Sequence, residues 1–252
     1  MERRGGRPQG GFTWNASAER RLAAVADGHG LAGPAREALR TVLDLLAREP
    51  TAVTSVRDPD AAVDVHVADS LVALELPEVQ AAQTVADLGS GGGFPGLALA
   101  AALPGARVAL VESAGRKCDF LRRAADSAGL VNVDVVHARA EAWPAGIGAH
   151  DLVVARALAA LPVVLEYAAP LLHVGGAVVA WKGRRDPSEE GDGAAAAAQL
   201  GLTVPIARAV RPFEGARDRH LFLSSKVSDT PPNYPRRPGM ASKRPLRAST
   251  GT

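Results

Sequence analysis

The sequence is poor in cysteine and aromatic residues and has no long unbroken apolar run. Cys118 is the only cysteine among 252 residues, which excludes an internal disulfide and any metal site built from several thiolates. The longest apolar stretches, 97–111 and 152–172, are interrupted by prolines and charges, so neither is expected to span a membrane. The first fifteen residues carry charge and glycine where a secretory signal needs an apolar core. We therefore expect a cytoplasmic protein without a metal or membrane partner.

Charge is nearly balanced over the whole chain but is unevenly placed. The formal net charge is +2, yet residues 226–252 hold six Lys or Arg residues against one acid, Asp229. A basic segment on a slightly acidic body indicates either a local anionic partner or a solvated, disordered tail. Five prolines in this segment forbid a long helix and favour an extended path across the body.

Apolar periodicity separates a helical first part from an α/β remainder. Residues 34–48 and 63–74 repeat apolar side chains at helical spacing. From Thr84 onward, short apolar runs alternate with amphipathic stretches, as is typical of βαβ units on a parallel sheet. The predicted strands are 84–88, 107–112, 132–136, 150–155 and 176–181, followed by an antiparallel pair at about 203–210 and 219–226, and a helix is predicted at 115–128. The predicted parts are a flexible N-terminus (1–16), a helical cap (17–80), an α/β domain (81–228) and a basic Pro-rich tail (229–252).

A glycine-rich loop at 89–96 follows the first predicted strand and opens a helix. Glycine permits close approach of the backbone, and a helix N-terminus offers free amides, so a nucleotide-like ligand is the natural occupant. Gly91, Gly93 and Gly96 match the dinucleotide fingerprint G-x-G-x-x-G. Asp87 followed by alternating glycines matches instead the first motif of class I methyltransferases. A purely structural turn is the third interpretation, and the loop alone leaves all three open.

The methyltransferase interpretation assigns a role to two carboxylates. S-adenosylmethionine carries no phosphate, so its site needs one carboxylate near the methionine ammonium and one for the ribose diol. Asp87 near the end of the first strand and Glu112 at the end of the second suit these roles. Glu112 could instead cap the helix that follows it.

Short motifs occur along most of the chain in a specific order and spacing. They are His66-x-x-Asp69-Ser70-Leu71, Asp87-x-Gly89-Ser90-Gly91-x-Gly93-Phe94-Pro95-Gly96, Glu112-Ser113-x-x-Arg116-Lys117, Arg139-Ala140-Glu141, Asp151-x-x-x-x-Arg156-Ala157, Lys182-Gly183, and Tyr234-Pro235-Arg236-Arg237 with Lys243. Over roughly residues 35–246 this set resembles the bacterial glucose-inhibited division protein B family, which methylates guanine N7 in small-subunit ribosomal RNA. The sequence departs from the family pattern at 51–54, where Asn-Leu-Thr is expected, and at Gly92, where alanine is common.

The resemblance implies a fold and an activity. The fold is α/β: a Rossmann-like, S-adenosylmethionine-dependent class I methyltransferase with a mostly parallel seven-stranded sheet, helices on both faces and an N-terminal helical cap. The implied activity is N7 methylation of one guanosine in the 16S decoding region, near where streptomycin acts. The implied partner is 16S ribosomal RNA or a small-subunit particle, and we expect a monomer. Two alternatives remain: an NAD-dependent oxidoreductase, for which no catalytic acid is recognisable, and a non-catalytic RNA-binding assembly factor.

Site residues follow from the same motifs. The cofactor set comprises Asp87, Gly89, Gly91, Gly93, Phe94, Glu112, Ala140, Glu141 and Arg156. Arg156 and Lys182 follow the fourth and fifth strands, at the sheet edge where open α/β folds bind ligands, and are expected to position the substrate. No general base is expected, because guanine N7 is a free acceptor. RNA contacts are expected from His66, Arg116, Lys117, Tyr234, Arg236, Arg237 and Lys243.

Overall fold

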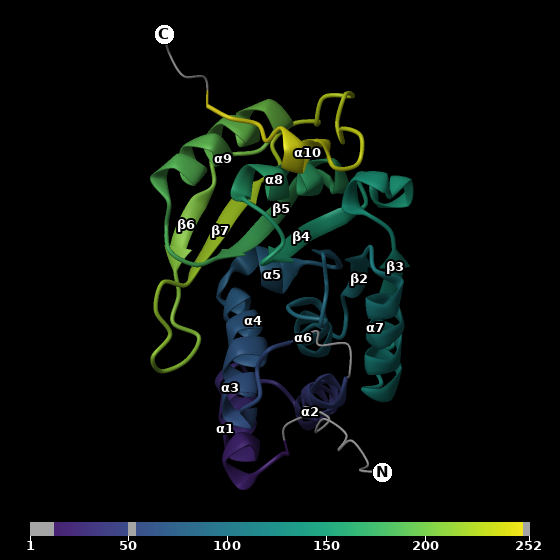
Figure 1. Cartoon of the computed structure of the whole chain (residues 1–252), viewed down its shortest axis with the longest axis vertical. Coiled ribbons are helices and arrows are strands. Elements are labelled where there is room, and N and C mark those ends of the chain that lie inside the picture. Colours follow the sequence, from purple (N-terminus) through teal and green to yellow (C-terminus); the bar gives the residue numbers. More distant parts are fainter. Residues whose placement is uncertain (1–12, 50–53, 249–252) are drawn as a thin grey trace, which may run out of the picture.

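The computed structural model describes residues 13–49 and 54–248. Residues 1–12 of the predicted flexible N-terminus lie outside these ranges. So do residues 51–53, which belong to the segment that departs from the family pattern. Within the described ranges no helix is long and apolar enough to cross a bilayer. The remainder forms one sheet with helices on both faces and a helical layer contributed by the N-terminal third of the chain (Figure 1).

The N-terminal helices have clear local signals. Asn15 caps α1 (Ala16–Gly28) by accepting from the Ala18 amide, and Pro34 occupies the first turn of α2 (Gly33–Arg48). The helix predicted at 34–48 is therefore confirmed. The run predicted at 63–74 is helical but changes pitch, passing through α3 (Pro59–Ala62), the π segment η1 (Val63–Ala68), α4 (Asp69–Leu71) and the 3₁₀ segment η2 (Val72–Glu75) before α5 (Pro77–Ala81). We call residues 16–81 the cap.

Seven strands form a single sheet in the order β3-β2-β1-β4-β5-β7-β6. They are β1 (Thr84–Leu88), β2 (Arg107–Glu112), β3 (Val133–His137), β4 (His150–Arg156), β5 (Leu172–Lys182), β6 (Ile206–Ala209) and β7 (His220–Ser225). β1 to β5 pair in parallel and β7 pairs antiparallel with both β5 and β6. The mostly parallel seven-stranded sheet is confirmed, although β5 begins four residues before the predicted position 176.

The two faces of the sheet bury separate cores, as the alternation within β1 shows. Val85 points into a core shared with the cap, α6 (Gly96–Ala102) and α7 (Gly115–Ser127). Ala86 and Leu88 point into a second core with α8 (Leu161–Ala168) and α9 (Pro187–Leu200). The remaining short segments are η3 (Ala140–Ala142), η4 (Pro144–Gly146), η5 (Ala169–Leu171) and α10 (Met240–Lys243).

The chain runs outward from β1 in both directions, to β2 and β3 on one side and to β4 and β5 on the other. Such a reversal opens a crevice at the carboxyl ends of the strands, where open α/β sheets bind ligands. The residues that follow β1, β2, β4 and β5 therefore gather at one edge. We call this the carboxyl edge and the opposite one the amino edge.

At the amino edge, Asp151 joins three strands. One of its oxygens accepts from the backbone amides of Gln83 and Thr84, at 2.9 and 2.7 Å, and from the Thr84 hydroxyl. The other oxygen lies 2.8 Å from His173 Nε2 in β5. Partial burial raises the pKa of Asp151, but the hydrogen bonds from His173, Thr84 and Gln83 outweigh this and lower it to about 2. The carboxylate is thus held ionised as a structural tie.

Candidate cofactor and acceptor site

The loop after β1 is shaped by three glycines. Gly89, Gly91 and Gly93 have φ values of 69°, 54° and 93°. Residues other than glycine rarely adopt this left-handed backbone conformation. The amides of Gly89 and Ser90 donate to the Val111 carbonyl of β2, and the Gly93 amide donates back to the Ser90 carbonyl at 2.7 Å. The loop is therefore held by its own backbone as it turns into α6.

Asp87 lies beneath this loop and is almost completely buried. One carboxylate oxygen accepts from the Gly96 amide at 3.1 Å, at the start of α6. The other, Oδ1, has no hydrogen-bond partner among the described residues. Burial raises the pKa of Asp87 to about 6, against the opposing effects of the Gly96 amide, Ser90 and Arg156. A buried carboxylate with an unmet oxygen suits a cationic or hydrogen-bond-donating ligand and does not suit a phosphate.

Glu112, at the end of β2, connects two loops. Its carboxylate accepts from the Gly91 amide at 3.0 Å and from the Ala114 amide at 2.8 Å. The contact with Ala114 caps the start of α7, as one of the two interpretations of this residue expected. Each oxygen of a carboxylate has two acceptor positions, so the capping contact does not consume the capacity to bind a diol.

A cavity of about 220 Å³ lies beside these residues at the ends of β2 and β3. It is lined by Gly89, Val111, Ser113, Ala138, Arg139, Ala140, Glu141, Leu158, Ala159, Tyr167 and Ser242. Ala140 and Glu141, predicted to contact the adenine, thus line the same cavity as Gly89. One Glu141 oxygen accepts from the Gly239 amide at 3.0 Å. Sequence reasoning missed Tyr167 and Ser242, and no local motif marks them. We call this space the cofactor cavity.

Phe94 and His66 pack against each other between the glycine loop and the cap. Their rings stack with centroids 5.2 Å apart, and His66 Nε2 lies 3.0 Å from the Thr54 hydroxyl. Burial, and secondarily the charge of Arg156, lowers the pKa of His66 to about 4. His66 is therefore neutral at pH 7, and the structure buries it in the cap and away from a surface open to RNA.

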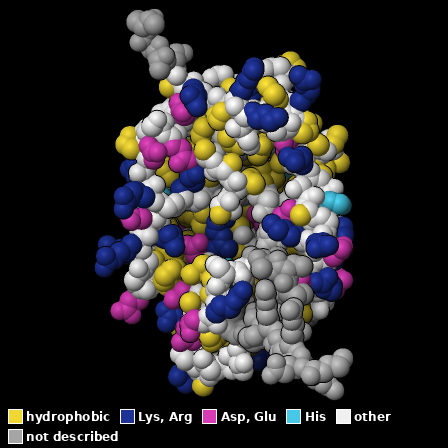
Figure 2. All heavy atoms as spheres, viewed as in Figure 1, with side chains coloured by type: hydrophobic (Ala, Val, Ile, Leu, Met, Phe, Trp, Pro, Cys, Tyr) yellow, Lys and Arg dark blue, Asp and Glu magenta, His cyan; other side chains and the backbone are white. Residues whose placement is uncertain are grey.

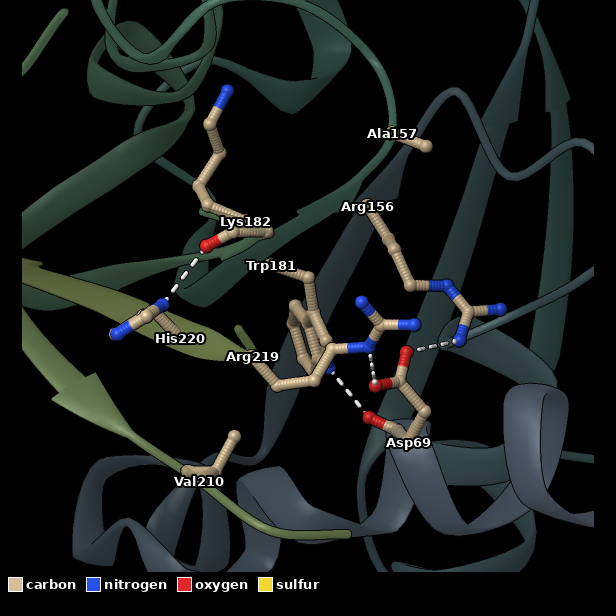
Figure 3. A pocket seen from close by; sticks show the side chains of 9 residues that line it. Asp69, Arg156, Ala157, Trp181, Lys182, Val210, Arg219 and His220 are labelled. Atoms are coloured by element: carbon tan, nitrogen blue, oxygen red, sulfur yellow. Dashed lines mark hydrogen bonds and ion pairs between the residues drawn. The ribbon is translucent and has the colours of Figure 1, made fainter. Parts of the chain in front are cut away.

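Arg156, at the end of β4, connects the sheet to the cap. Its guanidinium donates to the Val65 carbonyl and to the Asp69 carboxylate, both at 2.9 Å. Arg219 lies on the other side of the same carboxylate at 3.4 Å, and the Trp181 indole donates to the Asp69 backbone carbonyl at 2.6 Å. Figure 3 shows the two arginines on either side of Asp69. Sequence reasoning gave no role to Asp69, Trp181 or Arg219.

These side chains border a second cavity, of about 290 Å³. Its lining comprises Asp69, Arg156, Ala157, Trp181, Lys182, Gly183, Val210, Arg219 and His220. Ala157 in this lining has φ of 53°, a conformation that costs a non-glycine residue about 1–2 kcal/mol. Such local strain is characteristic of functional sites. We call this space the acceptor cavity.

Lys182 is placed differently from Arg156. Its ammonium donates to the Ala159 carbonyl at 3.1 Å and pairs with Glu189 of α9 at 2.5 Å. Its side chain points away from the Asp69 carboxylate (Figure 3). The two cations expected to act together therefore diverge, because Glu189 draws Lys182 toward the second core.

The residues expected to contact RNA are scattered. Arg116 is exposed and Lys117 half-buried at the start of α7, whereas Arg237 and Lys243 are exposed on the C-terminal segment. Arg236 instead forms a two-pronged ion pair with Glu166 of α8, at 2.6 and 2.5 Å. Tyr234 packs against the second core. Over residues 13–49 and 54–248 no group of acidic, His or Cys side chains could hold a metal ion.

Comparison with known proteins gives a consistent result. The family described as GidB, rRNA small subunit methyltransferase G, matches residues 37–214. The ribosomal RNA small subunit methyltransferase G of Rubrobacter xylanophilus is 47% identical over 202 residues, covering 77% of each chain. That of Desulfitobacterium hafniense is 38% identical over 201 residues, covering 79% of this chain and 83% of its own.

Solved structures agree on the fold. The S-adenosylmethionine-dependent methyltransferase SibL has a TM-score of 0.55 at 16% identity, over 84% of this chain and 74% of its own. A protein from Agrobacterium tumefaciens described as a predicted O-methyltransferase has a TM-score of 0.50 at 26% identity, over 64% and 81% of the two chains. The class I methyltransferase fold is thereby confirmed.

Proposed function

Because this chain belongs to the family of rRNA small subunit methyltransferase G, we propose that it transfers a methyl group from S-adenosylmethionine to N7 of one guanosine in 16S ribosomal RNA. The observation that carries the proposal is the buried Asp87 carboxylate with its unmet oxygen beneath the glycine loop. A dinucleotide would bring a pyrophosphate to this loop, next to a buried acid, so the oxidoreductase alternative is disfavoured. We expect a cytoplasmic monomer acting on ribosomal RNA or a small-subunit particle.

The residues of the carboxyl edge fit this cofactor. Asp87 would accept from the methionine ammonium and Glu112 from the ribose hydroxyls, while Gly89 and Gly91 allow the ligand close to the backbone. The cofactor cavity, with Ala140 in its wall, would take the adenine. When bound there, S-adenosylmethionine supplies an electrophilic methyl group.

The chain's own task is alignment. Guanine N7 is an acceptor with a free lone pair, so no side chain has to remove a proton before the transfer. His66, neutral at pH 7, fits a site without acid or base catalysis. Arg156 and Asp69 hold the cap against the end of β4, beside the acceptor cavity. Their role is to hold the purine in line with the methyl group and to exclude water.

The test is to map N7-methylguanosine in 16S RNA from cells with and without the gene, and to assay methyl transfer from labelled S-adenosylmethionine to small subunits lacking the modification. We expect Glu112→Ala to weaken cofactor binding at least tenfold, since it loses the diol contact and loosens the Gly91 loop. Arg107→Ala is the control, because this exposed residue lies at the amino edge with only an exposed ion pair. A wild-type protein that binds the cofactor but methylates no guanosine N7 would contradict the proposal.

A further inference from the structure

Two arginine-bearing segments flank the carboxyl edge, and they differ in what their charges do. The C-terminal segment is drawn inward: Arg236 pairs with Glu166, whose side chain is 2% exposed, and also donates to the Arg244 carbonyl. The Gly239 amide binds Glu141, and Ser242 lines the cofactor cavity. This segment therefore serves as a wall of the cofactor side. Releasing Arg236 to a phosphate would leave a buried carboxylate unpaired.

The connection between β6 and β7 keeps its charges outward. Arg211 and Arg217 are exposed, as is Arg208 in the adjoining β6, and none of them takes part in any ion pair found within the described ranges. Two acids, Glu214 and Asp218, share this stretch, so it carries a net positive charge. Figure 2 shows Lys and Arg side chains along the left margin of the molecule, where Figure 1 places the β6–β7 hairpin.

The connection also leads into the acceptor cavity. A hollow of about 1010 Å³ runs along residues 209–220 and shares Val210, Arg219 and His220 with the acceptor cavity. We call these three shared residues the mouth of the acceptor cavity. Behind the mouth, the cavity is lined by Trp181, Arg156 and Asp69. A path thus runs from exposed arginines to a partly apolar space at the end of β4.

The acceptor cavity contains one unmet polar atom. Asp69 is 7% exposed, and its Oδ1 has no hydrogen-bond partner among the described residues. The Arg219 guanidinium lies 3.4 Å from this Oδ1 atom and forms an ion pair with it. The Arg219 side chain is 40% exposed. A carboxylate accepts hydrogen bonds only, and guanine carries amino and N1 donors on the edge away from N7. A guanine with N7 toward the glycine loop would present these donors to the Asp69 end of the cavity, where the partly exposed Arg219 has to move aside before Oδ1 is reached. Adenine has no donor at N1.

We propose that the acceptor nucleotide is held here: Arg211 and Arg217 bind the RNA phosphates, and the target base enters the acceptor cavity past Val210. Resting on the function proposed above, this assignment moves RNA recognition from the C-terminal segment to the β6–β7 connection. Exposed, unpaired arginines contact phosphates with little desolvation to overcome, and each such contact adds to affinity and to its salt dependence.

The phosphate contacts are tested by charge reversal. In full-length protein we expect Arg211→Glu with Arg217→Glu to raise the KM for unmodified small subunits at least tenfold and to reduce the slope of log affinity against log salt by about 2. S-adenosylmethionine affinity should stay within twofold. The same charge change at Arg237 and Lys243 tests the earlier expectation for the C-terminal segment. A larger loss there than at Arg211 and Arg217, or equal losses, would overturn the inference.

Entry of the base is tested by narrowing the mouth. Val210→Phe enlarges a buried side chain that lines both hollows, whereas Val204→Phe makes the same change at a position 62% exposed near the start of β6. We expect Val210→Phe to cut kcat/KM for RNA at least tenfold with unchanged cofactor affinity and thermal stability within a few degrees, and Val204→Phe to leave all three unchanged. Normal kcat/KM in a folded Val210→Phe variant would refute base entry here. Wild-type protein without N7 transfer would instead refute the proposed function.

Discussion

Asp87 and Asp151 lie at opposite edges of the same sheet, and their surroundings are opposite in kind. Asp151 receives hydrogen bonds on both oxygens and has a pKa of about 2, so ionisation there stabilises the fold. Asp87 is more deeply buried, has one unmet oxygen and a pKa of about 6, so ionisation there is costly. The amino edge contributes stability, while the carboxyl edge keeps an acid with one oxygen that has no hydrogen-bond partner among the described residues.

This difference indicates that the carboxyl edge is less stable than the amino edge because its buried acid is available to a ligand. Groups with perturbed pKa values cluster at functional sites because the same burial that costs free energy prepares them for a ligand. Equivalent substitutions at the two edges should therefore have different, and in one case opposite, consequences.

The largest effect is expected from filling a glycine at each edge. A Cβ at Gly96 would lie 2.3 Å from a Leu110 methyl and 2.6 Å from the Asp87 carboxylate; one at Gly176 would lie 2.8 Å from the Asp151 carbonyl. Gly96→Ala and Gly176→Ala should each destabilise the protein by about 2–3 kcal/mol in urea titrations. Calorimetry should show a loss of cofactor affinity of at least tenfold for Gly96→Ala alone. Equal losses of affinity in both variants would remove the distinction between the edges.

Neutralising the two acids should shift stability in opposite directions. At pH 8, Asp87→Asn removes a buried charge and should raise the free energy of unfolding by about 1 kcal/mol, while weakening cofactor binding. Asp151→Asn removes a hydrogen-bonded charge and should lower the free energy of unfolding by about 1 kcal/mol. The effect is smaller than for a buried group because Asp151 is partly exposed to solvent. Chemical denaturation of the cofactor-free proteins measures both. Destabilisation by Asp87→Asn would show that its charge is already compensated.

The last expected difference concerns pH dependence. Asp87 titrates at about 6 in the folded state, above its usual value, so its contribution to stability falls as pH rises from about 4 to 6. His66, lowered to about 4, contributes the reverse: the unfolded chain binds its proton first, so stability rises between pH 4 and 6.5. The two contributions oppose each other in the wild type. The stability of Asp87→Asn relative to wild type should therefore increase by about 2 kcal/mol from pH 4.5 to pH 7; parallel curves would contradict the raised pKa.

The glycine loop was predictable because its function lies in consecutive backbone positions. Asp87, Gly89, Gly91 and Gly93 fall within seven residues, and conformational demands on glycine are visible in sequence. The strands were predictable for a similar reason, since β1 and β2 match their apolar runs residue for residue. Local signals were thus enough to predict the parallel sheet and the conformation of the glycine loop.

The acceptor side depends on partners that are distant in sequence. Arg156 was expected at the ligand edge, but its alignment with Asp69 depends on a cap residue 87 positions earlier. Lys182 occupies an equivalent strand end yet is drawn to Glu189. Arg236 looked like a free cation until the fold placed buried Glu166 beside it. Tertiary packing decides which charged side chains pair with each other, and the spacing of residues in the sequence does not predict these pairs.

The contact between Glu141 and Gly239 joins segments 98 residues apart, and it brings Ser242 to the cofactor cavity. A chain that has assembled only its parallel strands would have the glycine loop but an incomplete cavity. The cavity is therefore complete only when the contact between Glu141 and Gly239 is in place. The shape of the cavity thus depends on two segments that no local motif connects.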